Sequence, residues 1–114
     1  MIRTKRAYEA PDAADGTRFL VDRIWPRGVK KEALGVEGWL KEVAPSDDLR
    51  KWFGHDPEKW EKFQERYFAE LEGKEDALEP IRDAVLEGTV TLVYGAKDTE
   101  HNNAVALKAY LEDA

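Results

Sequence analysis

One short segment, residues 89–94, constrains the fold of this chain more than any other. Its sequence, TVTLVY, is rich in β-branched residues, carries no charge and is followed by Gly95. A strand that is apolar on both faces must be covered on both sides, which is typical of a parallel sheet flanked by helices. The segment therefore predicts an interior strand of an α/β domain.

Two further strands are predicted in the first quarter of the chain. Residues 2–8 alternate in polarity, with basic side chains on one side, as expected for an edge strand. Residues 19–25 form a mostly apolar run that follows a turn-rich segment and stops at Pro26, which favours an interior strand.

The region from about Lys31 to Glu87 has helical periodicity, in pieces broken by glycine and proline. Its clearest helix begins at Asp56, which can accept the free amides of the first turn, and ends at Gly73. Apolar residues recur at steps of three and four, which predicts one buried stripe. The stripe consists of Trp60, Phe63, Tyr67 and Leu71.

Two more helices are predicted toward the end of the chain. The first closes at Gly88, and because Pro80 has no backbone N–H, we expect this helix to start just before Pro80. The second covers residues 101–111, with Asp98 or Thr99 as its cap.

Together these elements predict a single compact α/β domain over residues 1–114, with a short, largely parallel sheet flanked by helices. The length is that of one typical domain. Because connections between parallel strands are right-handed, the ends of the strands at 19–25 and 89–94 should lie at one edge of the sheet. Residues 25–27 would then face residues 94–97.

The composition narrows the classes of function. The absence of cysteine excludes disulfides, thiolate metal sites and a cysteine nucleophile. No apolar run reaches membrane-spanning length, and the first six residues lack the apolar core of a signal peptide, so we expect a cytoplasmic protein with no membrane contact.

A candidate anion site follows the strand at 19–25. Arg23 and Arg27 flank Trp25 and Pro26, and a guanidinium offers a planar fork of donors that matches phosphate or carboxylate. Strand ends are where α/β domains place their sites. The alternative is that Arg23 pairs with a buried acid, Trp25 fills the core and Arg27 is solvated.

The segment between the strand at 89–94 and the last helix supplies further candidates. The start of a helix attracts anions, and Lys97, Asn102 and Asn103 lie close to it in sequence. His101 could act as an acid or base, and Tyr94 could position or protonate a substrate oxygen. The alternative is an ordinary helix cap with His101 on the surface. His55 and His101 lack a metal-binding spacing, so no metal site is predicted.

Four segments resemble the YeaO-like family, a domain of unknown function. They are LVDRIWPRG at 20–28, WLKEVAPS at 39–46, LRKWFGHDP at 49–57 and LVYGAKDTEHNNA at 92–104. The resemblance covers nearly the whole chain. It implies a compact single-domain bacterial or archaeal α/β protein, and it implies no established reaction.

The leading hypothesis is a protein that binds, or binds and processes, a phosphate- or carboxylate-bearing small molecule. Binding without turnover is favoured, because no serine lies on a recognisable nucleophile elbow and only His101 is a plausible base. The residues leave any cofactor unknown. The predicted ligand-binding residues are Arg23, Trp25, Arg27, Lys97, Asn102 and Asn103, and the predicted catalytic residues are His101 and Tyr94.

Two alternatives stay open. Residues 1–31 hold eight Lys or Arg against four Asp or Glu, so this basic front could bind nucleic acid, although the net charge of −6 disfavours it. The exposed first strand and the aromatic-rich middle could instead serve protein association without a small ligand, for example as a homodimer.

Overall fold

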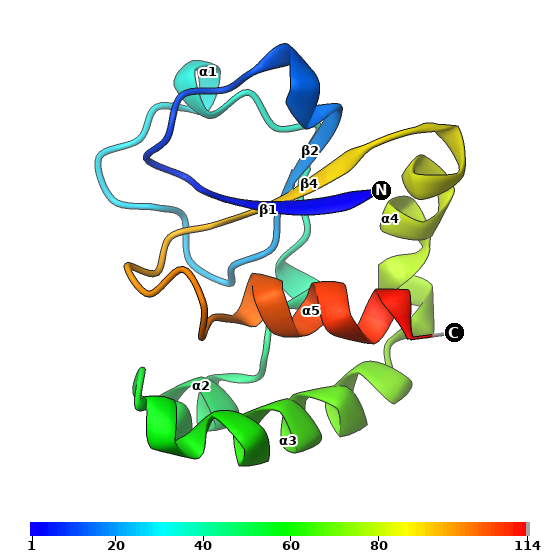
Figure 1. Ribbon diagram of the computed structural model, residues 1–114. Helices are drawn as coiled ribbons and strands as arrows, with labels where there is room; N and C mark the ends of the chain where they lie inside the picture. The colour runs from blue at the N-terminus through cyan, green and yellow to red at the C-terminus, as the bar shows by residue number, and fades with distance from the viewer. Residues whose placement is uncertain (114) are drawn as a thin grey trace.

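The structure is a computed structural model that describes residues 1–113, and it contains a four-stranded, fully parallel sheet (Figure 1). The predicted α/β fold with a parallel sheet is confirmed. The strand order is β1-β4-β2-β3. The strands are β1 (Ile2–Arg6), β2 (Thr17–Leu20), β3 (Gly38–Trp39) and β4 (Val90–Tyr94).

The described residues also form five α-helices and three short 3-10 turns. The helices are α1 (Lys31–Leu34), α2 (Asp47–Phe53), α3 (Trp60–Glu72), α4 (Glu75–Glu87) and α5 (Asn103–Glu112). The 3-10 turns are Ala13–Asp15, Lys41–Val43 and Pro57–Lys59. Within residues 1–113, none of the helices has the length and apolarity that crossing a membrane requires.

β4 occupies the centre of the sheet, as its composition predicted. All five of its residues are buried, and it pairs in parallel with β1 on one side and β2 on the other. Leu92, for example, stands opposite both Thr4 and Phe19. The carboxyl ends of β1, β4 and β2 therefore meet at one edge of the sheet.

β2 and β3 differ from the sequence prediction, which placed a strand at residues 19–25 and none at β3. β2 stops at Leu20 instead of continuing to Trp25, although Val21 still donates its N–H to the carbonyl of Val93 at 3.0 Å. β3 contains only Gly38 and Trp39, which pair with Phe19 and Leu20. A strand of two residues is too short to produce a period in the sequence.

The predicted stripe on α3 is the centre of the main core. Phe63, Tyr67 and Leu71 are buried, and the Tyr67 hydroxyl donates a hydrogen bond to the carbonyl of Val43. Asp56 caps the turn before α3 by accepting from the Glu58 N–H at 3.0 Å, as predicted.

Two predicted helix starts were wrong. α4 begins at Glu75 and holds Pro80 inside it, whereas we expected it to start just before Pro80. Pro80 removes only the bond to the carbonyl of Asp76, near the helix start, and it is exposed, so water can reach that carbonyl. α5 is capped by Asn102, which accepts from the Val105 N–H at 2.9 Å, instead of by Asp98 or Thr99.

The two faces of the sheet are covered differently. Helices cover one face, where residues such as Phe19 and Leu92 join the main core, and α5 contacts both β1 and β4. The opposite face carries a much smaller apolar cluster that is covered by α1 and by loops (Figure 1). This cluster consists of Ala7, Leu20, Leu34 and Val93, with Trp25, Val29, Val36 and Trp39 packed around it.

Beside the small cluster lies a buried ionic group, which we call the Asp15 network: Asp15, Lys5 and Arg18. Asp15 accepts from Arg18 Nη1 at 2.7 Å, from Lys5 Nζ at 3.2 Å and from the Asp12 N–H at 3.0 Å. Burial opposes the charge of Asp15, but these hydrogen bonds outweigh it and lower the pKa of the carboxyl. Arg18 also binds the carbonyl of Leu34, so the network ties β2 to α1.

Candidate ligand-binding site

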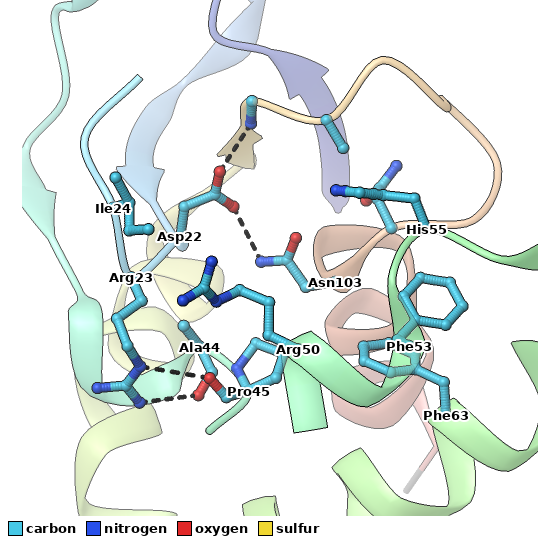
Figure 2. Close-up of a pocket in the computed structure, with 13 residues that line it drawn as sticks. Asp22, Arg23, Ile24, Ala44, Pro45, Arg50, Phe53, His55, Phe63 and Asn103 are labelled. Atoms are coloured by element: carbon cyan, nitrogen blue, oxygen red, sulfur yellow. Dashed lines mark hydrogen bonds between the residues drawn. The ribbon is translucent and has the colours of Figure 1, made fainter. Parts of the chain in front are cut away.

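A cavity of about 260 Å³ opens at the carboxyl end of β2 and β4 (Figure 2). The residues after β2 and β4 form one part of its wall, the start of α5 another, and α2 with the turn after it a third. Its polar lining residues are Asp22, Arg23, Arg50, His55, Asn102 and Asn103. Its remaining lining residues are Ile24, Ala44, Pro45, Phe53, Phe63, Gly95 and Ala96.

Asp22 is a carboxylate held in place by neutral donors. Its Oδ2 accepts from the Gly95 N–H at 2.8 Å and its Oδ1 accepts from Asn103 Nδ2 at 3.0 Å. Within residues 1–113 it forms no ion pair. Burial raises the pKa of Asp22, although the two hydrogen bonds and the charges of Arg50 and His55 act in the opposite direction.

Gly95 allows this close approach. A Cβ atom at residue 95 would lie 3.3 Å from Asp22 Oδ2, tighter than ordinary van der Waals contact. The loop that carries Gly95 is anchored from β1, because Arg6 Nε donates to the carbonyl of Ala96 at 2.8 Å. The end of β1 therefore fixes the loop that holds Asp22.

Arg23 and Arg50 supply cationic donors to the cavity. Arg23 is half-buried, and its guanidinium donates to the carbonyls of Pro45 at 3.3 Å and Ala44 at 3.4 Å. A half-buried guanidinium is expected to have an acidic partner or a bound anion, and Arg23 Nε forms an ion pair with Asp47 Oδ1 at 3.9 Å. Arg50, on α2, donates to Asp47 at 3.1 Å and extends toward Asp22 and Asn103 in Figure 2.

His55 reaches the cavity through an unusual backbone conformation. Gly54 and His55 follow α2 with φ angles of 53° and 57°, both in the left-handed region. This region is open to glycine and costs other residues energy, so His55 is held in a strained conformation. This backbone conformation turns the chain after α2 and brings the His55 side chain to the cavity wall.

The two predicted asparagines line the cavity, but their donors bind the protein itself. Asn102 Nδ2 donates to the carbonyl of Asp98 at 2.9 Å, while its oxygen caps α5. Asn103 Nδ2 donates to the carbonyl of Val21 and to Asp22, both at 3.0 Å. The structure thus gives both residues a part in building the wall, and their ligand contacts stay a prediction.

Three other predicted ligand-binding residues do not line this cavity. Trp25 packs edge-to-face on Trp39, with ring centroids 5.3 Å apart, and donates its Nε1–H to the carbonyl of Val29. Arg27 is exposed, and its carbonyl accepts from the Tyr8 hydroxyl at 3.0 Å. Lys97 is exposed in the loop after β4. Only Arg23 of the predicted cationic residues faces the cavity.

The two predicted catalytic residues also lie outside the lining. Tyr94 is buried, and this burial, followed by the charge of Glu9, raises the pKa of its hydroxyl. His101 is half-buried, with its Nδ1 3.0 Å from Asp98 Oδ2 and its ring edge-on to Trp60. Neither residue lines the cavity, and their catalytic roles stay predictions.

Sequence reasoning overlooked three residues of this wall as ligand-binding candidates: Asp22, Arg50 and His55. Asp22 directly follows the apolar run of β2, which is a usable signal. Arg50 and His55 gave no such signal, because they reach the cavity only through the packing of α2 against α3.

Comparisons with known proteins place the chain in a known family. A family model described as the inactive DUF488-N3 subclade matches residues 1–114. The chain belongs to this family. It is 41% identical over 110 residues to the uncharacterized protein YeaO of Escherichia coli (strain K12), which covers 96% of each chain. The YeaO-like resemblance is therefore confirmed.

A second relative is the uncharacterized protein Mb3100c of Mycobacterium bovis. The two chains are 40% identical over 110 residues, which is 96% of this chain and 92% of the relative. No solved structure matches the chain. The four segments that carry the YeaO-like resemblance supply twelve of the thirteen described residues that line the cavity, all except Phe63.

Proposed function

We propose that this protein binds a small phosphate- or carboxylate-bearing molecule in the cavity at the carboxyl edge of the sheet, without turning it over. The observation that carries the proposal is that Arg23, Arg50 and His55, from separate parts of the wall, all line one cavity. Arginine holds its charge at any biological pH, and its donors match the oxygens of phosphate and carboxylate.

Both arginines keep donors that the protein does not use. A guanidinium carries five N–H groups, so the pair offers about ten. Among the described residues Arg23 makes two hydrogen bonds and Arg50 makes one. Most of their N–H groups are therefore free to bind oxygen atoms of a ligand.

The size of the cavity favours a small ligand. A volume of 260 Å³ equals that of roughly nine water molecules in the liquid, at about 30 Å³ each. Such a space fits a metabolite of a few carbon atoms. Its apolar lining residues, which include Phe53 and Phe63, lower the local dielectric constant and strengthen the attraction between an anion and the arginines.

Binding without turnover is supported by the residue types in the wall. The described lining residues include no Ser, Thr, Cys, Lys or Tyr side chain that could act as a nucleophile. The Asp22 carboxylate is held in place by hydrogen bonds from Gly95 and Asn103. The description of the matching family as inactive agrees with a protein that binds but does not catalyse.

The contacts of the basic front, residues 1–31, favour a small molecule over nucleic acid as the ligand. Arg3 donates to the carbonyl of Ala14, Lys5 belongs to the Asp15 network, and Arg6 binds the loop after β4. These cations are engaged within the protein, so fewer are available for a phosphate backbone.

Binding can be measured by nuclear magnetic resonance, following the backbone amides during titration with propyl phosphate and, separately, propionate. We expect shifts at Gly95, His55 and Asn103. Arg50→Ala should weaken binding about tenfold or more, because a hydrogen bond to a charged group is worth about 1.5–3 kcal/mol. Unchanged binding in Arg50→Ala, or no binding by the wild type, would overturn the proposal.

Arg82 offers a matched control. It lies on α4, its side chain is 45% exposed against 43% for Arg50, and it pairs with Glu75 at 3.2 Å as Arg50 pairs with Asp47. It does not line the cavity. Arg82→Ala should therefore remove the same charge without changing the affinity for either anion.

A further inference from the structure

We infer that the ligand carries a hydroxyl group as well as an anionic group, and that the carboxylate of Asp22 accepts a hydrogen bond from this hydroxyl. The inference rests on the proposed function, because it places the anion at Arg50 and His55. It narrows the ligand to the class of sugar phosphates, sugar acids and related hydroxylated anions.

The Asp22 carboxylate can accept more hydrogen bonds than the protein donates to it. A carboxylate has about four lone-pair sites. The protein fills two of them, from Gly95 and from Asn103, and both donors come from the cavity wall itself. Figure 2 shows the carboxylate held between these two contacts. About two acceptor sites remain at a carboxylate that lines the cavity.

Asp15, a buried carboxylate outside the cavity, shows that this chain can surround a carboxylate with its own hydrogen-bond donors. Asp15 receives Lys5 on both oxygens, and Arg18 and the Asp12 N–H besides. Asp22, which is half-buried, has no comparable set of donors within the described residues. A hydroxyl of the ligand would fill a position that the protein leaves open.

The charge next to Asp22 favours a neutral hydroxyl over an ammonium group as the donor from the ligand. The positive charge of Arg50 acts on Asp22. An ammonium group at Asp22 would be repelled by Arg50, whereas a neutral hydroxyl would not. A hydroxyl between the anion and Asp22 also keeps the ligand's own negative charge away from the carboxylate.

Two matched pairs of probes test the inference. Glycerol 3-phosphate and propyl phosphate share a three-carbon chain and a phosphate, and they differ by two hydroxyls. Glycerate and propionate form the same contrast for a carboxylate. We expect the hydroxylated member to bind the wild-type protein roughly ten- to hundredfold more tightly in at least one pair, the range for a hydrogen bond to a charged group. The pair that responds identifies the anion.

Asp22→Asn should reduce this preference to about threefold or less, because the charged acceptor is gone. Propyl phosphate should bind this variant at least as tightly as the wild type, since a repelling charge is removed. Asp83→Asn is the control: Asp83 is exposed on α4 and does not line the cavity, so the preference should persist.

The outcomes separate the two proposals. If each pair binds with equal affinity, the hydroxyl inference is wrong and the proposed function stands. If none of the four probes binds, both are wrong. If Asp22→Asn does not fold, the ¹³C signal of the wild-type Asp22 carboxyl decides: it should shift with glycerol 3-phosphate and not with propyl phosphate, and an equal response to both would overturn the inference.

Discussion

The two ends of β2 carry two acidic residues with opposite surroundings. Asp15 precedes the strand and is fully buried, with two cations bound to it. Asp22 follows the strand and accepts only from neutral groups. The pKa of Asp15 is lowered by its partners, whereas the pKa of Asp22 is raised by burial. Burial alone therefore does not decide what a carboxylate does; the donors around it decide.

The two ends also differ in how they use left-handed backbone. Gly16, next to Asp15, has a φ of 64°, and a Cβ there would lie 2.1 Å from the carbonyl oxygen of Thr89. At the other end, His55 takes a φ of 57° although it is not glycine. The amino end of the sheet is built for stability, and the carboxyl end keeps strain and unused hydrogen-bonding capacity around a cavity.

The largest expected contrast is in stability. Asp15→Asn should lower the free energy of unfolding by about 3–5 kcal/mol, because it leaves Arg18 and Lys5 without their charged partner. Asp22→Asn should lower it by about 1 kcal/mol or less, since losing one neutral hydrogen bond is offset by removing a poorly solvated charge. Urea unfolding at pH 7 measures both. Equal losses would show that the two carboxylates are structurally equivalent.

The second contrast compares two arginines of the carboxyl edge. Arg50 lines the cavity and Arg27, the clamp suggested by the sequence, does not. Arg50→Ala should weaken propyl phosphate binding about tenfold or more, and Arg27→Ala by about twofold or less, through long-range attraction alone. Titrations at low and moderate salt measure both affinities. A larger loss for Arg27→Ala would place the anion outside the cavity.

The third contrast is the pH dependence of stability. Asp15 has a lowered pKa, so its contribution is present above the ordinary aspartate value of about 3.9 and is lost as pH falls through the folded value. Asp22 has a raised pKa, so its contribution is present below that value and is lost as pH rises through the folded value.

Unfolding of the wild type and both Asn variants across pH 3–7 tests this sign. The advantage of the wild type over Asp15→Asn should shrink toward acid, and its stability relative to Asp22→Asn should fall as pH rises from about 4. Parallel curves for the two variants would contradict the assignment of opposite shifts.

The smallest expected effect concerns His55. His55→Asn should stabilise the protein by about 0.5–1 kcal/mol, because asparagine tolerates the left-handed region better, and should weaken anion binding. Thermal unfolding combined with the phosphate titration measures both effects. Gly16→Ala should instead lower the stability of the protein, since the new Cβ would overlap the backbone of Thr89. A destabilised His55→Asn would mean that the imidazole packs for stability.

Much of the fold could be predicted from local pattern. The uncharged β-branched run of β4 predicted a covered central strand, and the stripe on α3 predicted its buried face. The errors came where tertiary contacts outweigh local signals. β3 is too short to be periodic, and α4 tolerates Pro80 because its missing bond lies near an exposed helix start.

The site could be predicted less completely. The order of the strands directed attention to the edge where Arg23 and Asn103 face the cavity. Trp25 belongs instead to the small cluster under α1, because the loop after β2 folds back over that face. Arg50 enters the wall from a helix whose position depends on packing against α3, and no spacing in the sequence encodes that distance.

The order of the strands has a consequence for synthesis on the ribosome. β1 and β2 emerge first, but they pair with β4 and not with each other. The strand that joins them, at residues 90–94, is synthesised after both. Until that segment leaves the exit tunnel, the edges of β1 and β2 that face β4 have no partner in the nascent chain, so the sheet is completed only after residues 90–94 have emerged.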